Sequence, residues 1–311
     1  MKKVSANITE KFLKQFPNGK IEEPLKPYTS FKIGGPAGLF IKLTDDKTLN
    51  DLLRFIKTEN IPYLILGGGC NTLIDSKGFD GLVIKMDLKK ISSDIENELI
   101  AGAGTPISTL INESIRLGLT GLEKWMGLPG SVGGAIRGNA GYLGLETKDI
   151  LLKAEIFDPQ TLKTAEYSNS DLQFSYRTSA IKQSDKIVLS GTFKLKKSDI
   201  TLEEQNKIIE ESKNFRIQKQ PPGFSAGSFF KNPSTDQPAG LLIDQCGLKG
   251  KELGGAKISE KHANFFINTG TATFEDILSL ARLAKSEVQK KFGITLEEEV
   301  QIISKNGKIS L

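Results

Sequence analysis

Apolar residues recur every three or four positions in several stretches of the chain, which is the spacing of one face of an α-helix. This pattern predicts helices over 49–56, 107–115 and 273–292. Thr105 and Pro106 stand directly before the second of these helices. Because threonine caps helix ends and proline fits a first turn, we expect these two residues to begin it.

A further helix is predicted after residue 200. Thr201 and Glu204 form a capping box, in which each side chain satisfies a backbone N–H of the first turn. The helix should stop before the turn Pro221-Pro222-Gly223. Its apolar positions predict one buried stripe, made of Leu202, Ile208, Ile209 and Phe215.

Strands are predicted where short apolar runs are bounded by turn residues. They lie at 61–66, 99–103, 152–157, 187–195 and 300–303. Helices and strands alternate at first, and strand-like segments dominate from about residue 151 to 196. We therefore expect two α+β domains: a polar N-terminal segment over 1–20, a first domain over 21–196 and a second domain over 197–311.

The composition is that of an ordinary folded protein. The 311 residues include 42 Lys and Arg against 37 Asp and Glu, and 38% are apolar, which excludes a disordered chain. The net charge of +5 is too dilute, and the basic runs too short, to indicate a nucleic-acid partner. No apolar stretch reaches the roughly 18 residues of a membrane span.

Cysteine and histidine are scarce. The two cysteines, Cys70 and Cys246, are too few for a disulfide framework and favour a reducing, cytoplasmic location. The single histidine, His262, is expected to be structural or exposed. With so few nitrogen and sulfur ligands, we expect no metal site.

Glycine is over-represented, at 31 of 311 residues, and it is clustered. Gly67, Gly68 and Gly69 follow a predicted buried strand and precede Cys70-Asn71-Thr72. Three glycines let backbone N–H groups point at an anion, so the loop is typical of a phosphate cradle, with a tight turn as the open alternative. Neither G-x-G-x-x-G nor G-x-x-x-x-G-K-[ST] occurs, so neither a Rossmann nor a Walker site is indicated.

A second cluster begins at Pro129 and Gly130 and continues through Gly133 and Gly134 to Gly138-Asn139-Ala140-Gly141. So many glycines cannot form a regular apolar face, and they indicate close backbone approach to a flat or anionic group. Two separated clusters in one domain fit a bound dinucleotide, with one cluster for each half of the ligand.

Seven motifs, taken together and in chain order, resemble those of a single protein family. They are residues 29–37, 67–72, 129–134, 174–177, 226–233, 239–250 and 296–300. Over nearly its whole length the chain resembles the UDP-N-acetylenolpyruvoylglucosamine reductases, also called UDP-N-acetylmuramate dehydrogenases. The resemblance implies an α+β FAD-binding domain of the vanillyl-alcohol-oxidase type, with two α+β subdomains, followed by a smaller α+β substrate-binding domain.

The resemblance also implies a reaction. Such an enzyme uses bound FAD and the hydride donor NADPH to reduce UDP-N-acetylglucosamine enolpyruvate to UDP-N-acetylmuramate, for peptidoglycan precursor synthesis. We expect a cytoplasmic monomer that binds NADPH and a UDP-sugar, without nucleic acid or membrane insertion. Two other classes stay open: an oxidase of alcohols or sugar lactones on the same flavin fold, and a non-catalytic UDP-sugar or nucleotide-binding module.

The chemistry suggests what the site needs. Hydride addition leaves enolate-like charge beside a carboxylate, so a fixed cation and a proton donor are required. By resemblance, Arg177 stabilises this charge, Ser228 donates the proton, and Glu299 assists electrostatically or in proton handling. The expected substrate contacts are Tyr176, Lys231 and Asn232. The expected FAD contacts are Gly67, Gly68, Gly69, Cys70, Asn71, Thr72, Gly104, Pro129, Gly130, Ser131, Gly133, Gly134, Asn139 and Ala140.

Each catalytic assignment has a simpler alternative. Arg177 could be a surface ion-pair partner, and Ser228 an ordinary turn serine. Glu299 is the last of three consecutive glutamates, and strand alternation would place Glu297 on its side and Glu298 on the other. Among these three, only the family motif selects Glu299.

Two features depart from common members of the family. Tyr142-Leu143-Gly144 has a different order of aromatic and glycine, which affects only the details of flavin contact. The stretch from Arg177 to Ser228 is short, which resembles the compact class that lacks an inserted, tyrosine-bearing loop over the substrate.

Overall fold

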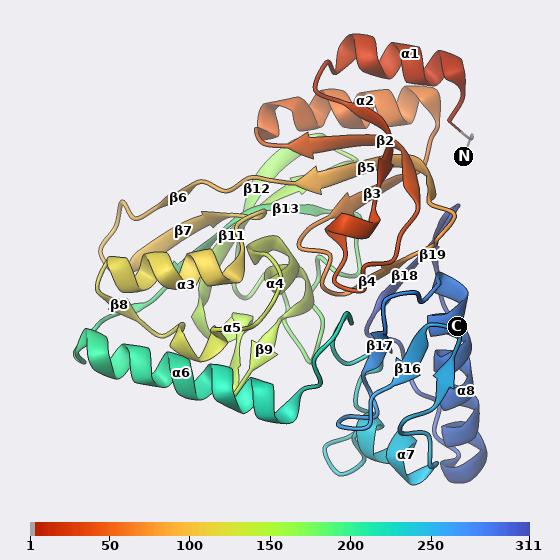
Figure 1. The fold of residues 1–311 in the computed structure, drawn as a ribbon. Coiled ribbons are helices and arrows are strands. Elements are labelled where there is room, and N and C mark those ends of the chain that lie inside the picture. The colour runs from red at the N-terminus through yellow and green to blue at the C-terminus, as the bar shows by residue number, and fades with distance from the viewer. Residues whose placement is uncertain (1–3) are drawn as a thin grey trace.

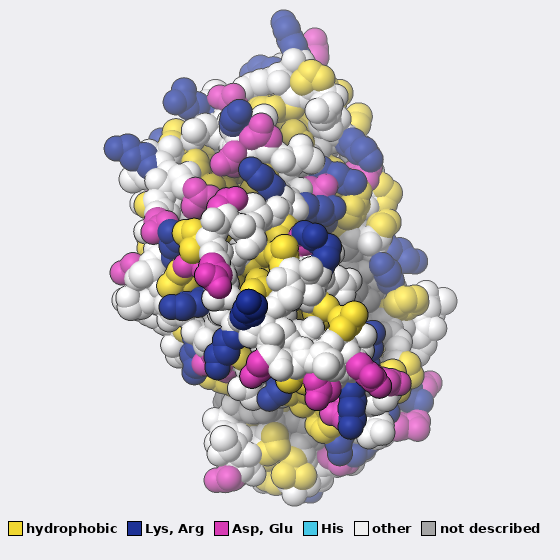
Figure 2. Space-filling view, turned by 90° about the vertical axis from the view of Figure 1, so that its left-hand side faces the viewer, with side chains coloured by type: hydrophobic (Ala, Val, Ile, Leu, Met, Phe, Trp, Pro, Cys, Tyr) yellow, Lys and Arg dark blue, Asp and Glu magenta, His cyan; other side chains and the backbone are white. Residues whose placement is uncertain are grey.

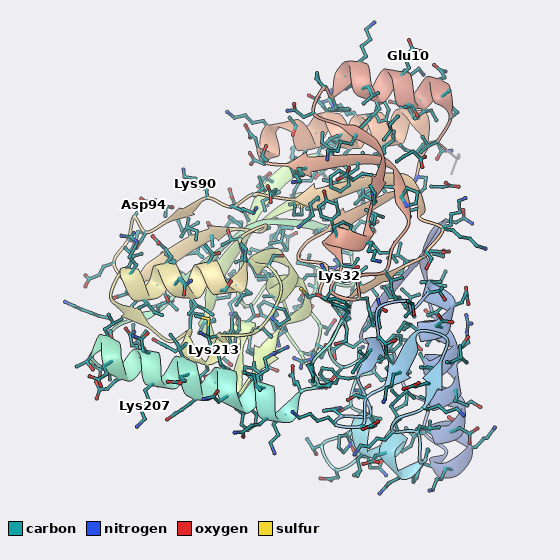
Figure 3. All side chains as sticks on the ribbon, viewed as in Figure 1. Glu10, Lys32, Lys90, Asp94, Lys207 and Lys213 are labelled. Carbon is teal, nitrogen blue, oxygen red and sulfur yellow. The ribbon has the colours of Figure 1, made fainter. Side chains whose placement is uncertain are left out.

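The computed structural model describes residues 4–311, so residues 1–3 of the predicted N-terminal segment lie outside the described part. A larger N-terminal body, red to green, stands beside a C-terminal unit in blue (Figure 1). On the face shown in Figure 2, basic and acidic side chains are interspersed, in keeping with the small net charge. Charged side chains such as Glu10, Lys90 and Lys207 stand on the outside of the molecule (Figure 3).

The N-terminal body begins with a four-stranded sheet. Its order is β1 (Lys20–Pro24), β2 (Pro36–Leu43), β5 (Phe79–Met86) and β3 (Tyr63–Leu66). The last three strands are parallel, and β1 is antiparallel to β2. Helices α1 (Ala6–Gln15) and α2 (Leu49–Glu59) lie side by side on this sheet, and the 3-10 turns η1 (Lys26–Tyr28) and η2 (Asp46–Thr48) precede β2 and α2 (Figure 1).

A five-stranded antiparallel sheet follows. Its order is β12 (Lys163–Ser168), β11 (Leu151–Asp158), β13 (Ile187–Lys194), β7 (Glu98–Gly102) and β6 (Ile91–Ser92). The helices of this region are α3 (Ile107–Arg116), α4 (Val132–Gly138), α5 (Thr147–Ile150) and α6 (Leu202–Lys219). Its smaller elements are η3 (Glu123–Trp125) and the strand pairs β8 (Leu119–Thr120) with β14 (Lys196–Lys197) and β9 (Gly141–Tyr142) with β10 (Leu145–Glu146).

The C-terminal unit packs a long helix on a small sheet. The sheet has the order β15 (Glu252–Leu253), β16 (Ala256–Ile258) and β17 (Phe266–Asn268), and the helices are α7 (Ala239–Gln245) and α8 (Phe274–Phe292). The chain then returns to the N-terminal body. Strand β18 (Gln301–Ser304) pairs in parallel with β4 (Thr72–Ile74) and antiparallel with β19 (Gly307–Ile309). This return brings residue 299 to the end of the first glycine cluster.

The hydrophobic core has two large parts. One joins both N-terminal sheets and their helices and includes Ile209 of α6. The other fills the C-terminal unit and reaches into the N-terminal body through Phe31 and Leu73. The N-terminal segment, expected only to be polar, contributes helix α1, whose Phe12 is fully buried and stacks on Phe55. Only Ile8 and Phe12 of this helix are buried, which is too few apolar positions to predict a helix from spacing.

The predicted helices over 49–56, 107–115 and 273–292 are confirmed as α2, α3 and α8. The capping role of Thr105 is wrong, because Pro106 occupies the N-cap position and no side chain caps α3. The predicted strands are confirmed within one or two residues as β3, β7, β11, β13 and β18.

The buried stripe predicted for α6 is confirmed only in part, since Ile209 is buried and Ile208 is half-buried. The capping box of this helix and its end before Pro221 are confirmed. Leu202 and Phe215 are 61% and 43% exposed. The helix instead buries a polar contact, because the side-chain amide of Gln205 donates to Glu123 Oε1 of η3 at 2.9 Å. Apolar spacing alone cannot reveal a face that is held by a hydrogen bond.

Candidate active site

The two glycine clusters lie against each other. The backbone N–H of Gly68 donates to Ser131 Oγ at 3.3 Å. A Cβ atom on Gly68 would stand only 2.7 Å from Gly130 Cα, closer than real side chains approach. Residues 67–69 and 130–134 therefore form a single site, called the glycine cradle below.

The cradle is closed on one side and open on the other. Gly69 has a φ of +67°, and a Cβ there would lie 1.9 Å from Tyr28 O, so glycine is required. Beside Gly130 and Gly138, by contrast, no described protein atom lies within 4 Å of an added Cβ. Closely packed backbone with an open side fits the phosphate groups of FAD.

Gly104 and Gly133 let neighbouring backbone segments approach beneath the cradle. The N–H of Gly133 donates to Ala103 O at 2.9 Å, and a Cβ on Gly104 would lie 2.7 Å from Asp87 Cα. The hydroxyl of Thr105 is buried here and has no hydrogen-bond partner among the described residues. A buried unpartnered hydroxyl next to the cradle agrees with a polar ligand.

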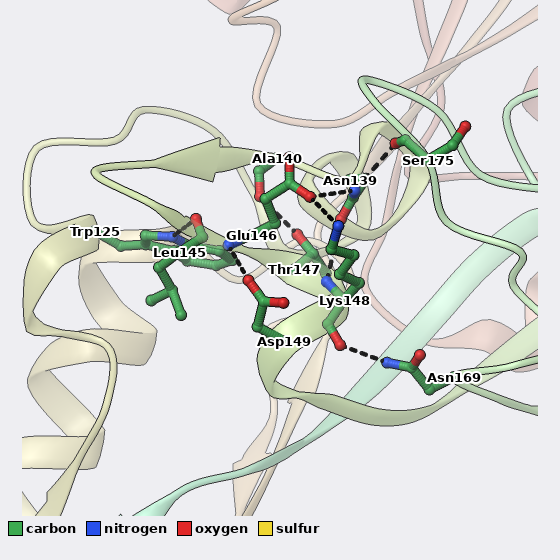
Figure 4. A network of polar contacts seen from close by, with 10 residues as sticks. All are labelled: Trp125, Asn139, Ala140, Leu145, Glu146, Thr147, Lys148, Asp149, Asn169 and Ser175. Atoms are coloured by element: carbon green, nitrogen blue, oxygen red, sulfur yellow. Dashed lines mark hydrogen bonds and ion pairs between the residues drawn. The ribbon is translucent and has the colours of Figure 1, made fainter.

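Asn139 and Ala140 are bound into the protein itself (Figure 4). The amide of Asn139 donates to Ser175 O at 3.0 Å and to Glu146 Oε2 at 3.1 Å, and its oxygen accepts from Lys148 N at 3.1 Å. The carbonyl of Ala140 accepts from the backbone N–H and the hydroxyl of Thr147. The Asn139 side chain therefore has no amide hydrogen left for a cofactor.

The end of the first glycine loop is fastened to the C-terminal strand. Asn71 donates its side-chain N–H to the backbone carbonyl of Glu299 at 3.0 Å. The backbone carbonyl of Asn71 accepts from Gln301 N at 2.9 Å. Thr72 is paired with Gln301 in the parallel β4–β18 ladder, and Cys70 Sγ contacts Gly68 O at 3.3 Å. The pairing of β4 with β18 thus holds Glu299 next to the glycine cradle.

Arg177 stands at the tip of a tight turn. Ser175 and Thr178 exchange two backbone hydrogen bonds of 3.1 Å, which leaves Tyr176 and Arg177 as the turn residues. Arg177 has a φ of +55°, in the left-handed region that is uncommon for residues other than glycine. Such backbone outliers persist where the surrounding structure fixes them.

The guanidinium of Arg177 faces Glu299. Arg177 Nε lies 3.0 Å from Glu299 Oε1, an ion pair in which the N–H is not aligned as a hydrogen bond. Burial raises the pKa of Glu299 above its ordinary value, against the opposite effect of Arg177, Lys182 and Lys231. A partly buried carboxylate thus orients a fixed cation next to the cradle.

The three consecutive glutamates have three different partners. Glu297 pairs with Lys231 at the surface, and Glu298 pairs with Lys285 of α8 at 2.5 Å. Only Glu299 contacts Arg177. The geometry therefore singles out Glu299 from its neighbours.

Ser228 lies on the strand-like segment next to Glu299. The N–H of Glu299 donates to the carbonyl of Phe229 at 2.8 Å. Ser228 also lines a cavity of about 260 Å³ in the C-terminal unit, together with Asn232, Asp244, Lys249, Lys261 and His262. Burial lowers the pKa of His262, which leaves the ring neutral and makes it a hydrogen-bonding group.

The three expected substrate contacts, Tyr176, Lys231 and Asn232, lie close to one another. The hydroxyl of Tyr176 accepts from the N–H of Asn232 at 3.4 Å, although 56 residues separate them. Lys231 is adjacent and electrostatically coupled to Glu299. The turn that carries Arg177 is thereby linked to the segment that carries Ser228.

Two half-buried lysines beside the site were missed from the sequence. Lys182 donates to Arg177 O at 2.6 Å, and Lys85 of β5 donates to Gly67 O at 2.6 Å. Burial lowers the pKa of both. Lys85 stands inside an apolar strand, a pattern that could have marked it as a buried cation, whereas nothing near Lys182 gives such a signal.

Comparison with known proteins decides between the interpretations. The family model of the FAD binding domain matches residues 37–161, and that of the UDP-N-acetylenolpyruvoylglucosamine reductase C-terminal domain matches 218–303. The reductase of Caldanaerobacter subterraneus subsp. tengcongensis is 40% identical over 95% of this chain and 98% of its own length. That of Clostridioides difficile is 39% identical over 92% and 94%.

A solved structure gives the same answer. The UDP-N-acetylenolpyruvylglucosamine reductase of Thermus caldophilus superposes with a TM-score of 0.76 at 35% identity, covering 91% of this chain and 99% of that one. The chain belongs to the UDP-N-acetylenolpyruvoylglucosamine reductase family. The predicted fold, an FAD-binding domain followed by a reductase C-terminal domain, is confirmed.

Membership of this family also confirms the predicted function, an FAD-dependent UDP-N-acetylmuramate dehydrogenase of peptidoglycan precursor synthesis, for which NADPH is the hydride donor. It decides against an alcohol or lactone oxidase and against a non-catalytic binding module. Among residues 4–311, none of the helices combines the length and apolar character needed to cross a membrane. In the same range, no group of three or more His, Cys, Asp or Glu side chains could hold a metal ion.

Proposed function

We propose that Arg177, Ser228 and Glu299 carry out the substrate-reducing step of this enzyme. The observation that supports this assignment is the Arg177–Glu299 pair, which stands where the glycine loop, the Tyr176-Arg177 turn and the segment of Ser228 meet. When bound, FAD supplies the hydride that it has taken from NADPH. The side chains then have to stabilise the substrate and deliver a proton.

The charge that develops on the substrate determines the role of each residue. Hydride addition at C3 of the enolpyruvyl group places negative charge on C2 and the adjacent carboxylate. The guanidinium of Arg177 stabilises this charge because it stays protonated and can bind a carboxylate through two N–H groups. The hydroxyl of Ser228 donates the proton to C2, and Glu299 holds the guanidinium in place.

The cofactor is held mainly by backbone. We assign its phosphates to the open side of the glycine cradle, with Ser131 and the loop residues Cys70, Asn71 and Thr72 completing the site. Pro129 and the small residues Gly104, Gly133 and Gly134 let the chain approach closely. Asn139 and Ala140 contribute by shaping the loop that follows α4, because their polar groups are engaged within the protein.

The substrate is assigned to the cavity beside Ser228. Its diphosphate is anionic, and two lysines line the cavity: Lys261, and Lys249, which pairs with Asp244 at 2.6 Å. Nδ1 of His262 accepts from Asn264 N at 3.2 Å, so the proton of the neutral ring is on Nε2, available to an acceptor. We assign Tyr176, Lys231 and Asn232 to substrate contacts, because Asn232 lines the cavity and bonds to the Tyr176 hydroxyl beside Arg177.

The test separates the two half-reactions. In anaerobic stopped-flow experiments, Ser228→Ala should bleach with NADPH at nearly the wild-type rate. Reoxidation by the enolpyruvyl UDP-sugar should be slower by roughly 100- to 10,000-fold, because a positioned proton donor is missing. Ser225→Ala, three residues away in the same loop, is the control. Equal loss of both half-reactions in Ser228→Ala would refute the assignment.

We also infer that the enzyme is a cytoplasmic monomer of the compact class. Its residues 178–227 are occupied by β13, β14, α6 and their connections. Sedimentation of the purified holoenzyme tests the monomer.

A further inference from the structure

Lys182 is a half-buried cation beside the Arg177 turn, and the mechanism above leaves it without a role. Its ammonium group donates to the backbone carbonyl of Arg177 at 2.6 Å. Within residues 4–311 this carbonyl accepts no other hydrogen bond, because the two bonds of the turn use Ser175 and Thr178. Lys182 is therefore the side chain that binds the backbone of the left-handed residue Arg177.

Lys182 is itself fixed from the cradle side. Arg137 of α4 donates to Ile181 O at 2.7 Å and to Lys182 O at 3.3 Å. Ser179 Oγ donates to Arg137 O at 2.8 Å and accepts from the backbone N–H of Lys182 at 3.3 Å. At the other end of the loop 175–182, the side chain of Asn139, which caps the end of α4, donates to Ser175 O. Helix α4, which begins in the glycine cradle, thus holds this loop at both ends.

The charge of Lys182 also acts on Glu299. Three cations lower the pKa of this carboxyl group against the effect of burial: Arg177 on the turn, Lys182, and Lys231 on the segment after Ser228. The groups that act on Lys182 are Lys231, Arg137, Lys308 and Glu299, and only Glu299 is negative. Burial and these neighbouring cations lower the pKa of Lys182, and Glu299 acts in the opposite direction.

We propose that Lys182 is a positioning residue for substrate reduction: it holds the carbonyl of the Arg177 turn and so fixes the guanidinium relative to Glu299 and the cradle. This inference rests on the roles proposed above for Arg177 and Glu299. It assigns Lys182 no contact with the substrate or with FAD.

The first experiment compares Lys182→Met with Lys182→Arg in the holoenzyme. Reoxidation of the reduced enzyme by the enolpyruvyl UDP-sugar should slow roughly 10- to 100-fold in Lys182→Met, since small displacements of a reacting group have effects of this size. Bleaching by NADPH should stay within about twofold of wild type, and Lys182→Arg should recover most of the lost rate. Lys186→Met is the matched control, because Lys186 contacts Tyr167 and Asp158 instead.

A pH profile separates positioning from simple structural damage. With Lys182 gone, one of the three cations that favour the Glu299 carboxylate is missing. The acid limb of the reoxidation rate should therefore move to higher pH in Lys182→Met and stay in place in Lys182→Arg. If Lys182→Met does not fold, Lys182→Gln keeps a donor to the Arg177 carbonyl without the charge, and the same shift is expected.

A double-mutant cycle with Arg177→Gln distinguishes this inference from the proposed function. If Lys182 acts through Arg177, the double variant should reoxidise no more slowly than Arg177→Gln alone. Additive losses, or a wild-type rate in Lys182→Met beside a slow Arg177→Gln, would overturn the role of Lys182 alone. A wild-type rate in Arg177→Gln would instead overturn the assignment of Arg177, and with it both proposals.

Discussion

The two sides of the active site are built from different material. The glycine cradle is made of backbone, packed so closely that a Cβ on Gly68 or Gly69 has no room. The other side is a charged cluster, made of Arg177, Lys182, Lys231 and Glu299. The cradle is therefore sensitive to added atoms, and the cluster to removed charges.

This contrast indicates where each kind of change should be measured. Overfilling a closely packed site costs about 1 to 3 kcal/mol, which appears in the affinity for the group that occupies it. Removing a charge that faces the developing negative charge acts on the transition state and so on a rate. Cradle variants should alter FAD affinity, and cluster variants should alter reoxidation by substrate.

Among the variants that compare the cradle with the charged cluster, Glu299→Gln should have the largest effect. Without the carboxylate, Arg177 loses its partner, and reoxidation by the UDP-sugar should slow roughly 100- to 1,000-fold with FAD content unchanged. Burial raises the pKa of Glu299, so in the wild type the carboxylate is lost as the pH falls through a value above that of an ordinary glutamate. Single-turnover rates across pH should show this acid limb in the wild type and none in Glu299→Gln. A surviving limb would mean that another group titrates.

A smaller effect, on a different quantity, is expected for Gly69→Ala. An alanine in the left-handed region costs about 1 to 2 kcal/mol, and its Cβ would lie 1.9 Å from Tyr28 O. FAD should therefore bind roughly 30- to 100-fold more weakly. The measurement is a titration of apoprotein with FAD. Gly118→Ala is the control, because Gly118 lies outside the cradle and has the same φ of +67°, but its Cβ would meet no described protein atom within 4 Å. Unchanged FAD affinity in Gly69→Ala would break the contrast.

The smallest effect is expected for Glu297→Gln. Its side chain is 69% exposed, and its ion pair with Lys231 lies at the surface. Such pairs contribute about 0 to 1 kcal/mol, so the reoxidation rate should change less than roughly fivefold. This variant is the counterpart of Glu299→Gln within the same run of glutamates. A loss as large as that of Glu299→Gln would show that the charged cluster extends to the surface.

Local features of the fold were predictable from the sequence. The spacing of apolar residues gave α8 and its buried face, because that helix packs on a single sheet. In α6 the predicted stripe is exposed at Leu202 and Phe215, because Gln205, not Phe215, faces η3. The predicted boundary near residue 196 stays a prediction, and Ile209 shows that α6 packs into the first core.

Long-range features of the site were not predictable by the same means. The first glycine cluster was predicted to be a phosphate cradle, a role that stays a prediction, and only the fold shows that Gly68 lies against Gly130. The second cluster was predicted to lack a regular apolar face, which is wrong, because Val132–Gly138 form α4 and bury Val132, Ala135 and Ile136. Which glutamate faces Arg177 depends on where β18 pairs, a contact with no local signature. Lys182 lies in a loop without a regular pattern, and its partial burial arises where Arg137 of α4 binds the Lys182 carbonyl.

The parallel pairing of β18 with β4 also sets an order of assembly during synthesis. Asn71 and Glu299, which it brings together, are 228 positions apart in the chain. Contacts of such separation are slow to form, and domains fold in the order in which they leave the ribosome. The glycines of the cradle and strand β13, on which α4 packs, have all been synthesised by residue 194, whereas the carboxylate that orients Arg177 follows only at residue 299. A nascent chain should therefore acquire the capacity to hold a flavin well before it acquires the capacity to use one.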